Sequence, residues 1–583
     1  MNEISGPVKL TRIKYLVYFV IFIAVIFEMR LFQRQILQHK AYAEMASKQY
    51  NAKVDVPAKR GDIYIRDRDN QNLLDPSKAG LFPVAVNLDL YDVLAVPKNI
   101  PDKRDAAKKI AEVVQTDENT IFNEINNDKL YVPPLAKRIS KEVADKIDAL
   151  KLEGIALESV QSRYYPEKNF LSHALGFVNF EGDGKYGLEE YYDSILKGNG
   201  GEVEGLKDSS GKIIQIIQSN QGQDGASVVL SIDRSIQYVV EKKLKEGIER
   251  FATDGGTIIV MDPKSGNILA MASQPDFDPN NFNKVAKDNE SAFLNPATSL
   301  MWEPGSIFKP VTVSAAINEN LLQPDSKPDE AHGGFSNFVT IDGYKIHNAL
   351  DEPYGYETVN QILENSDNVG MVWVADFLQN ELFDKYIEKY GFGSKTGIDI
   401  SGEASGAVRD WRKWRDVNRA TIAFGQGISV TPIQVIQAYS VFANKGKMVI
   451  PRLVEEIIKP NGEEEILPTK EPKEIISGDT AKKMTEMLIN VVTNGHGKAA
   501  AVDGYKVAGK TGTAQIPNPE GGYEENANIG SFAGYAPADD PKFVMLVKFN
   551  RPKNVEWAES SAAPIFGEIA DWLLNSYYKV PKN

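Results

Sequence analysis

The sequence contains no cysteine among its 583 residues, and this absence excludes several kinds of chemistry. Disulfide bonds, cysteine-ligated zinc, iron–sulfur clusters and thiol nucleophiles all need that side chain. Histidine is scarce too, and the five histidines show no ligand spacing of the H-E-x-x-H type. We therefore expect no metal site and no cofactor. A G-x-S-x-G nucleophile elbow is also missing, although the residue count alone leaves a Ser-His-Asp hydrolase open.

Positive charge is in the minority. Lys and Arg number 66 against 80 Asp and Glu, which gives a formal net charge of −14 at pH 7. Because phosphate binding needs clustered positive charge, we expect no nucleic-acid partner. With 42% hydrophobic and 25% charged residues, the composition is that of a chain that folds, and its length predicts roughly three or four domains.

Long apolar runs occur at one place only. Tyr15–Phe27 holds thirteen residues without a charge, and basic residues precede it. A cleaved signal peptide and a buried soluble helix are alternatives, but the nearest small-residue cleavage pattern, at Ala41, lies too far downstream. We expect one transmembrane helix over 15–32 in the cytoplasmic membrane, with snorkelling basic residues at its ends. The tail 1–14 would then lie in the cytoplasm and everything after it outside.

The rest of the chain divides in two by pattern. Residues 33–224 mix short alternating runs with turn signals, which predicts an α+β module. Further on, a strand is followed by Asp233, which can cap an amphipathic helix, and then by a hairpin. Another strand, Phe543–Phe549, comes near the end. A sheet built from strands of both ends predicts one domain over 225–577, with a tail over 578–583.

Ser306-Ile307-Phe308-Lys309 matches an S-x-x-K pattern. Positions i and i+3 share one face of a helix, so the Lys309 amine can reach the Ser306 hydroxyl. A serine loses its proton at neutral pH only beside a base, and a desolvated lysine can be that base. Pro310 places the pair in the first turn of a helix. Taken alone, the pattern favours an ordinary solvated helix face, and Ser209–Lys212 and Ser576–Lys579 match it by chance.

Two further short motifs follow. Ser366-Asp367-Asn368 lies between two apolar helical stretches, where a short loop can present a hydroxyl and an amide to a cleft. Lys510-Thr511-Gly512-Thr513 lies in a strand-like run and offers a cation, a hydroxyl and a glycine that permits close approach. Alone, each is equally consistent with a polar helix junction or a strand end. A second K-T-G, Lys395-Thr396-Gly397, has a turn-like context.

The three motifs, in this order and on these elements, form the signature of penicilloyl-serine transferases. With them the chain resembles the class B penicillin-binding proteins, which are monofunctional peptidoglycan D,D-transpeptidases. The wider stretches 302–309, 425–432 and 507–515 match the same family. Its non-catalytic pedestal motifs are matched by Arg60-Gly61-Asp62, Arg163-Tyr164-Tyr165-Pro166 and Gly187-Leu188-Glu189.

The resemblance implies an α+β fold in three parts. A transmembrane helix would precede an α+β pedestal domain of the dimerisation type over 33–224. The domain over 225–577 would be a transpeptidase of the penicillin-binding and serine β-lactamase type, in which helices flank an antiparallel sheet.

The resemblance also implies a set of site residues. The catalytic ones would be Ser306, Lys309, Ser366, Asn368 and Lys510, and the substrate-binding ones Thr511, Gly512 and Thr513. Ser306 would attack the penultimate D-Ala carbonyl of a stem pentapeptide, Lys309 would take its proton, and Ser366 would pass it to the leaving amine. Asn368 would hold the substrate amide and the K-T-G-T stretch its carboxylate. The backbone N–H groups of Ser306 and Thr513 would form the oxyanion hole.

The partners that this resemblance implies are all parts of cell-wall synthesis. They are peptidoglycan stem pentapeptides, lipid-linked precursor strands, a membrane glycan polymerase of the SEDS family and other divisome proteins, with β-lactams as covalent inhibitors. Ser531–Pro537 resembles the division (septal) type more than the elongation type.

Other functions remain open at this point. A class A β-lactamase shares the three motifs, but it is normally soluble and activates water with a glutamate in an E-x-x-L-N loop. The nearest string here, Glu486–Asn490, is typical of a helix. A bifunctional penicillin-binding protein would carry an E-D-x-x-F-x-x-H motif before residue 225, and none occurs. A β-lactam sensor or a silent scaffold is the remaining alternative, and the intact motifs argue against it.

Overall fold

The computed structural model of the chain describes residues 8–67, 80–207, 213–220, 222–285, 289–518 and 520–582. Residues 1–7 of the predicted cytoplasmic tail and the chance motif Ser209–Lys212 lie outside them. The chain divides into two compact units, Met1–Ala58 with Gly198–Asp224, and Lys59–Lys197 with Gly225–Asn583. The predicted 33–224 module is thus shared by both units, and its borders stay a prediction.

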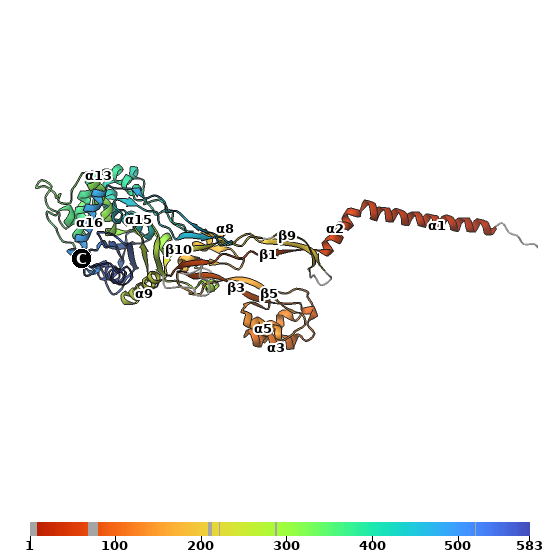
Figure 1. Ribbon diagram of the computed structural model, residues 1–583. Coiled ribbons are helices and arrows are strands. Elements are labelled where there is room, and N and C mark those ends of the chain that lie inside the picture. The colour runs from red at the N-terminus through yellow and green to blue at the C-terminus, as the bar shows by residue number, and fades with distance from the viewer. Residues whose placement is uncertain are drawn as a thin grey trace, which may run out of the picture. The chain divides into compact units, whose positions relative to one another are not determined.

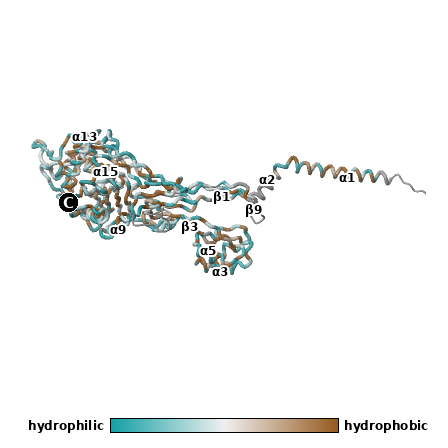
Figure 2. The backbone as a smooth tube through the Cα atoms, in the orientation of Figure 1, coloured by the Kyte–Doolittle hydropathy of each residue, from teal (hydrophilic) through white to brown (hydrophobic). Residues whose placement is uncertain are grey.

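The first unit begins with α1 (Val8–Phe32), which contains the predicted span 15–32 (Figure 1). Hydrophobic residues run along this helix (Figure 2), and most of their side chains from Ile13 to Phe32 are exposed. Among the described residues, one helical stretch, Arg12–Leu37, is long and apolar enough to cross a membrane, so this helix fits a single-pass anchor. The π-helix Gln33–Leu37 and α2 (His39–Tyr50) follow. The unit ends in an antiparallel sheet of β1 (Asn51–Val56), β8 (Gly201–Lys207) and β9 (Ile213–Asn220).

The second unit contains a mixed sheet that crosses the predicted border at residue 225. β10 (Ser227–Asp233) pairs parallel with β2 (Ile63–Arg66) and antiparallel with β16 (Val454–Ile458). The sheet order is β17-β16-β10-β2-β3-β4, and β5 pairs with β3. Its other strands are β3 (Leu81–Ala95), β4 (Ala136–Ile139), β5 (Ile155–Tyr164) and β17 (Glu464–Ile466). The helices α3 (Lys103–Val114), α4 (Glu118–Ile125) and α5 (Lys141–Ala149) share a separate apolar core with β3.

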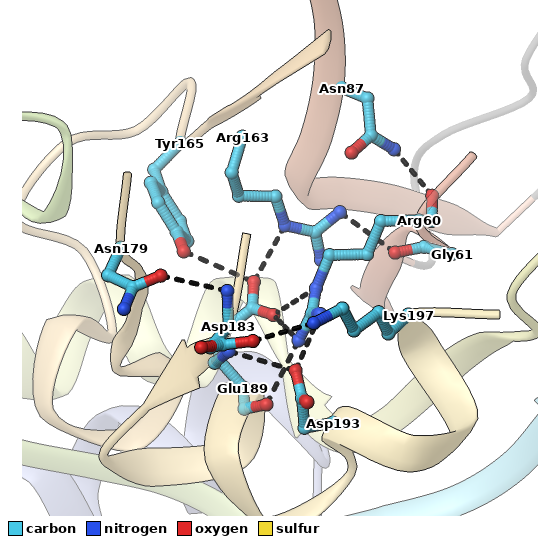
Figure 3. Close-up of polar contacts among 11 residues, drawn as sticks. Arg60, Gly61, Asn87, Arg163, Tyr165, Asn179, Asp183, Glu189, Asp193 and Lys197 are labelled. Carbon is cyan, nitrogen blue, oxygen red and sulfur yellow. Dashed lines mark hydrogen bonds and ion pairs between the residues drawn. The ribbon is translucent and has the colours of Figure 1, made fainter. Parts of the chain in front are cut away.

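The three predicted pedestal motifs meet in this unit on one buried carboxylate (Figure 3). Glu189 lies on α7 (Gly187–Tyr191), and its side chain is fully buried. Its Oε2 accepts a hydrogen bond from Arg60 Nε at 2.8 Å, and its Oε1 accepts from Arg163 Nε at 2.6 Å. Tyr165 donates its hydroxyl proton to the same Oε1 at 3.1 Å. Arg60 also pairs with Asp193 at 2.7 Å, so segments more than 100 residues apart are held together by charge-assisted bonds.

A five-stranded antiparallel sheet in the order β12-β11-β21-β20-β19 organises the C-terminal part of the chain. Its strands are β11 (Gly255–Met261), β12 (Ile268–Gln274), β19 (Ala508–Pro517), β20 (Tyr523–Ala536) and β21 (Phe543–Asn550). The predicted hairpin and the predicted strand Phe543–Phe549 are therefore confirmed. So is the cap at Asp233, whose Oδ1 accepts hydrogen bonds from the N–H groups of Ser235 and Ile236.

Alternate residues of this sheet face two different apolar cores. Ile258 and Val260 pack with α9 (Arg234–Phe251) and α17 (Ala562–Trp572), whereas Ile259 and Met261 pack with helices that include α15 (Pro432–Ala443). The other helices of the C-terminal part are α10 (Pro296–Ser299), α11 (Lys309–Asn318), α12 (Val359–Glu364), α13 (Asn368–Lys389), α14 (Asp416–Ile422) and α16 (Gly478–Thr493). A sheet covered by helices on both faces confirms the predicted α+β fold.

The smaller elements complete the second unit. They are α6 (Ser172–Leu175), α8 (Asp193–Leu196), β6 (Phe177–Val178) with β7 (Gly184–Lys185), β13 (Phe338–Ile341) with β14 (Tyr344–His347), and β15 (Lys447–Met448) with β18 (Lys473–Glu474).

Candidate active site

Ser306 lies on a short turn in front of a buried helix. The turn is the 3₁₀ helix η6 (Gly305–Phe308), and α11 continues from it with Pro310 in its first turn, as the sequence predicts. Gly305 has a φ of +59°, a left-handed conformation that favours glycine. Its N–H donates to the carbonyl oxygen of Gly425 at 3.0 Å. This bond fixes the turn, and with it the half-buried serine.

Ser366 lies at the junction of α12 and α13, where the polar S-D-N loop is predicted. Its φ of +56° is uncommon for a serine and marks a constrained position. Asn368 is the first residue of α13, and its backbone N–H donates to Asn348 Oδ1 at 3.1 Å. Its side-chain amide donates to the His347 carbonyl at 2.9 Å. These bonds hold the loop so that the Ser366 hydroxyl faces inward.

The K-T-G stretch lies on β19, an edge strand of the five-stranded sheet, as predicted. Lys510 pairs in register with Ala533 on β20. At Gly512 a β-carbon would come within 2.9 Å of Ile307 and 3.1 Å of the Pro304 carbonyl. Only a residue without a side chain therefore lets the strand approach the nucleophile turn so closely.

Four of the predicted catalytic residues are in direct contact. The Ser366 hydroxyl is 3.1 Å from Lys309 Nζ and 3.0 Å from Lys510 Nζ. Lys309 Nζ also donates to Asn368 Oδ1 at 2.9 Å. Ser306 lines the same cleft, but among the described residues its hydroxyl makes no hydrogen bond. The structure thus brings the S-x-x-K, S-D-N and K-T-G motifs together around one serine hydroxyl.

Both lysines are fully buried, and this changes their acid–base chemistry. Burial lowers the pKa of Lys309 well below its ordinary value, and the nearby Lys510 cation lowers it further. Burial also lowers the pKa of Lys510 to about 7. A lysine that is neutral near physiological pH can accept a proton from a serine, so the site can support nucleophilic catalysis.

Two buried carboxyl groups beside Lys309 were not assigned a role from the sequence. Asp367 is fully buried, and Glu357 is 5% exposed. Burial raises the pKa of both groups, that of Glu357 to about 7. Asp367 could have been found from the sequence, because it is the central residue of the S-D-N motif. Glu357 could not, because it belongs to no motif.

The cleft in front of these residues has a volume of about 140 Å³. Its lining consists of Gly305, Ser306, Ala349, Leu350, Tyr354, Asn365, Ser366, Asn368, Phe424, Gln426, His496, Thr511, Thr513, Trp557 and Glu559. Five predicted residues line it, Ser306, Ser366, Asn368, Thr511 and Thr513, whereas Lys309, Lys510 and Gly512 are not among the lining residues. Sequence reasoning missed His496 and Glu559. No group of three or more His, Asp or Glu among the described residues could hold a metal ion.

The chance motifs lie elsewhere. In the second K-T-G, Thr396 is in a loop, and its N–H and hydroxyl both bond to Glu403. Ser576 belongs to the π-helix Leu573–Tyr577 at the end of the chain. Neither residue lines the cleft.

Two family models match the chain. One, described as a penicillin binding protein transpeptidase domain, matches residues 256–571. The other, described as a penicillin-binding protein dimerisation domain, matches residues 55–230. Together they cover both the five-stranded sheet and the region of the Glu189 network.

Relatives and solved structures resemble the chain over most of its length. It is 33% identical over 576 residues to Stage V sporulation protein D of Bacillus subtilis, covering 97% of this chain and 86% of that protein. It is 30% identical over 502 residues to the peptidoglycan D,D-transpeptidase FtsI of Escherichia coli, covering 85% and 82%. The crystal structure of penicillin binding protein 3 from Mycobacterium tuberculosis complexed with aztreonam matches with a TM-score of 0.69 at 26% identity, covering 91% and 98%.

Proposed function

Since the chain belongs to the class B penicillin-binding proteins and is a serine-type peptidoglycan D,D-transpeptidase, we propose that Ser306 carries the acyl-enzyme of its reaction. The observation that carries this proposal is the meeting of two buried lysine amines on the Ser366 hydroxyl, in the cleft that Ser306 lines. A β-lactam would acylate the same oxygen.

Acylation is a nucleophilic substitution at a peptide carbonyl. Ser306 Oγ forms a bond to the penultimate D-Ala carbonyl carbon, and neutral Lys309 takes the hydroxyl proton. Lys309 Nζ bonds to the Ser366 hydroxyl, which passes a proton to the nitrogen of the terminal D-Ala as the peptide bond breaks. The terminal D-Ala leaves as a neutral amine, and the donor stem remains as an ester on Ser306.

The other motif residues bind the donor. Asn368 Oδ1 accepts from Lys309, and one of its two amide hydrogens bonds to the His347 carbonyl, so the second hydrogen is available to a substrate amide. The Thr511 and Thr513 side chains line the cleft and would bind the terminal carboxylate with the Lys510 charge behind them. The N–H groups of Ser306 and Thr513 would stabilise the oxyanion, each contributing about 3–4 kcal/mol.

Turnover of a stem pentapeptide by the full chain in detergent tests this function. We expect release of D-alanine and formation of a cross-linked product when an acceptor amine is present. A β-lactam sensor would instead be acylated once and release nothing further, and that result would contradict the transpeptidase reaction.

We also propose the wider setting of this reaction. The helix within 15–32 would anchor the chain in the cytoplasmic membrane, with 1–14 inside and the 33–224 and 225–577 domains outside, ahead of the tail 578–583. Its substrates would be stem peptides and lipid-linked precursor strands, and its protein partners a SEDS-family glycan polymerase and other divisome proteins. Ser531–Pro537 lies on β20 and in the turn after it. Its resemblance to the division type supports a division role. A fluorescent fusion should concentrate at the septum, and a uniform sidewall pattern would favour the elongation type.

A further inference from the structure

His496 and Glu559 form a hydrogen-bonded pair in the catalytic cleft that the reaction described above does not use. His496 Nδ1 is 2.8 Å from Glu559 Oε2, and the two side chains are 37% and 41% exposed. Both line the cleft beside Ser306 and Thr513. Among the described lining residues, Glu559 is the only one with a carboxylate and His496 the only one with an imidazole. The pair therefore gives this part of the cleft a negative charge and a basic ring.

The pair is held in place from two separate segments. His496 lies in the turn after α16, where the N–H of Gly495 donates to the Asn490 carbonyl. A β-carbon at Gly495 would come within 2.4 Å of the Glu364 carbonyl oxygen, so this turn packs directly on the end of α12. Glu559 lies on the 3₁₀ helix η9 (Ala558–Ser560), and the N–H of Ala558 donates to Thr513 Oγ1 at 3.0 Å. Both segments are thus fixed to elements that carry the catalytic motifs.

The hydrogen bond determines which ring nitrogen is free. A carboxylate only accepts, so His496 Nδ1 carries the proton that it donates to Glu559. In the neutral ring, Nε2 then keeps a lone pair and can accept a proton from a bound group. A carboxylate that orients an imidazole and compensates its positive charge is the arrangement found behind histidine bases in hydrolases.

Resolution of the acyl-enzyme needs such a base. The acceptor is an amine, and a primary alkyl amine at neutral pH is almost entirely an ammonium ion, which has no lone pair for attack. Two protons must therefore leave its nitrogen. The second can return to Ser306 through Ser366 and Lys309, the reverse of the acylation route. That route returns one proton to Ser306 and has no place for the first proton.

We propose that His496 and Glu559 form the binding site for the ammonium group of the acceptor stem, an inference that rests on the proposed transpeptidase function. Glu559 attracts the cation, and His496 Nε2 takes its first proton, which then passes to solvent. The neutral nitrogen forms the new bond to the ester carbonyl carbon. Its second proton returns to Ser306 Oγ as the ester bond breaks, so the enzyme is restored.

Partition of an acyl-enzyme between two acceptors tests this site in the full chain in detergent. The donor is an N-acyl-D-alanyl thioester, which has no amine, so any effect of the pair falls on the acceptor. Nα-acetyl-lysine, whose side-chain amine is an ammonium ion at neutral pH, is compared with hydroxylamine, which is mainly neutral there. In His496→Ala we expect kcat/KM for Nα-acetyl-lysine to fall about 100-fold, the usual size of a general-base effect, and that for hydroxylamine to stay within about threefold. Glu559→Gln should weaken the binding of Nα-acetyl-lysine, which raises the KM for this acceptor.

The matched control is Asp351→Asn. Asp351 bonds to Nδ1 of another histidine at the same 2.8 Å, but it does not line the cleft, so this variant should behave like wild type with both acceptors. Equal losses for Nα-acetyl-lysine and hydroxylamine in His496→Ala and His496→Gln would show a merely structural role and overturn the proposal. An unchanged rate with Nα-acetyl-lysine would overturn it as well. Failure of the wild-type chain to be acylated by the thioester would contradict the proposed function instead.

Discussion

Removal of the Glu189 charge should destabilise the second unit without changing the cleft that Ser306 lines. The substitution Glu189→Gln keeps the shape of the side chain but leaves two buried guanidinium groups, on Arg60 and Arg163, without their shared carboxylate. The exposed fractions of these three side chains are 0%, 8% and 2%, in the order Glu189, Arg60, Arg163, so solvent cannot compensate. Breaking a buried pair costs about 3–5 kcal/mol. Because Arg60 keeps its ion pair with Asp193, we expect a loss of stability at the lower end of this range, about 3 kcal/mol.

Hydrogen exchange measures this loss locally and does not require the whole chain to unfold in one step. A loss of about 3 kcal/mol corresponds to roughly 100-fold faster exchange of protected amides in β2 and α7. The control is Glu142→Gln, which breaks the exposed i,i+4 pair with Lys146 and should change exchange by about twofold. If β2 in Glu189→Gln exchanged at the wild-type rate, the network would contribute no stability and our reasoning would be refuted.

Three further outcomes follow from the site and the anchor. Lys309→Arg should slow penicillin acylation by at least about 100-fold, because a guanidinium keeps its proton. In wild type the acylation rate should fall as pH falls, since protonation of Lys309 removes the base, and a flat pH profile with a near-normal variant would make Lys309 merely structural. A chromogenic cephalosporin should give one stoichiometric burst and then almost no turnover, because Glu486–Asn490 lies within α16 rather than in a lactamase-type loop, and rapid turnover would indicate a β-lactamase. Protease added to intact spheroplasts should digest everything after about residue 33, whereas a mature chain that starts near Glu44 would mean a cleaved signal peptide.

The local features of this chain could be predicted because their causes are local. Asp233 caps α9, as the sequence predicts, and α12 begins with a capping box of Thr358 and Gln361, whose T-x-x-Q spacing is equally local. The S-x-x-K, S-D-N and K-T-G motifs were recognisable for the same reason, since each lies within one turn or one strand. Their order along the chain then indicated the family and the fold.

Features that depend on distant segments could not be predicted in this way. The residues next to Ser366 do not indicate that two buried lysines, 57 and 144 residues away, meet on its hydroxyl, and only the family resemblance places the three residues in one site. The parallel pairing of β10 with β2 joins strands on either side of the predicted border. His496 and Glu559 are 63 residues apart and follow no motif, so only the folded chain shows that they share the catalytic cleft.

Labelling by a fluorescent penicillin tests the central claim most directly. Ser306 begins the one S-x-x-K that lies in the cleft with Ser366 and the K-T-G strand, among the residues that the structure describes. The full wild-type chain should take up one label, found by mass spectrometry on the peptide that contains Ser306, and Ser306→Ala should take up none while it keeps the wild-type circular dichroism. A label that persists in folded Ser306→Ala, or that maps to another peptide, would contradict the assignment of Ser306 as the nucleophile.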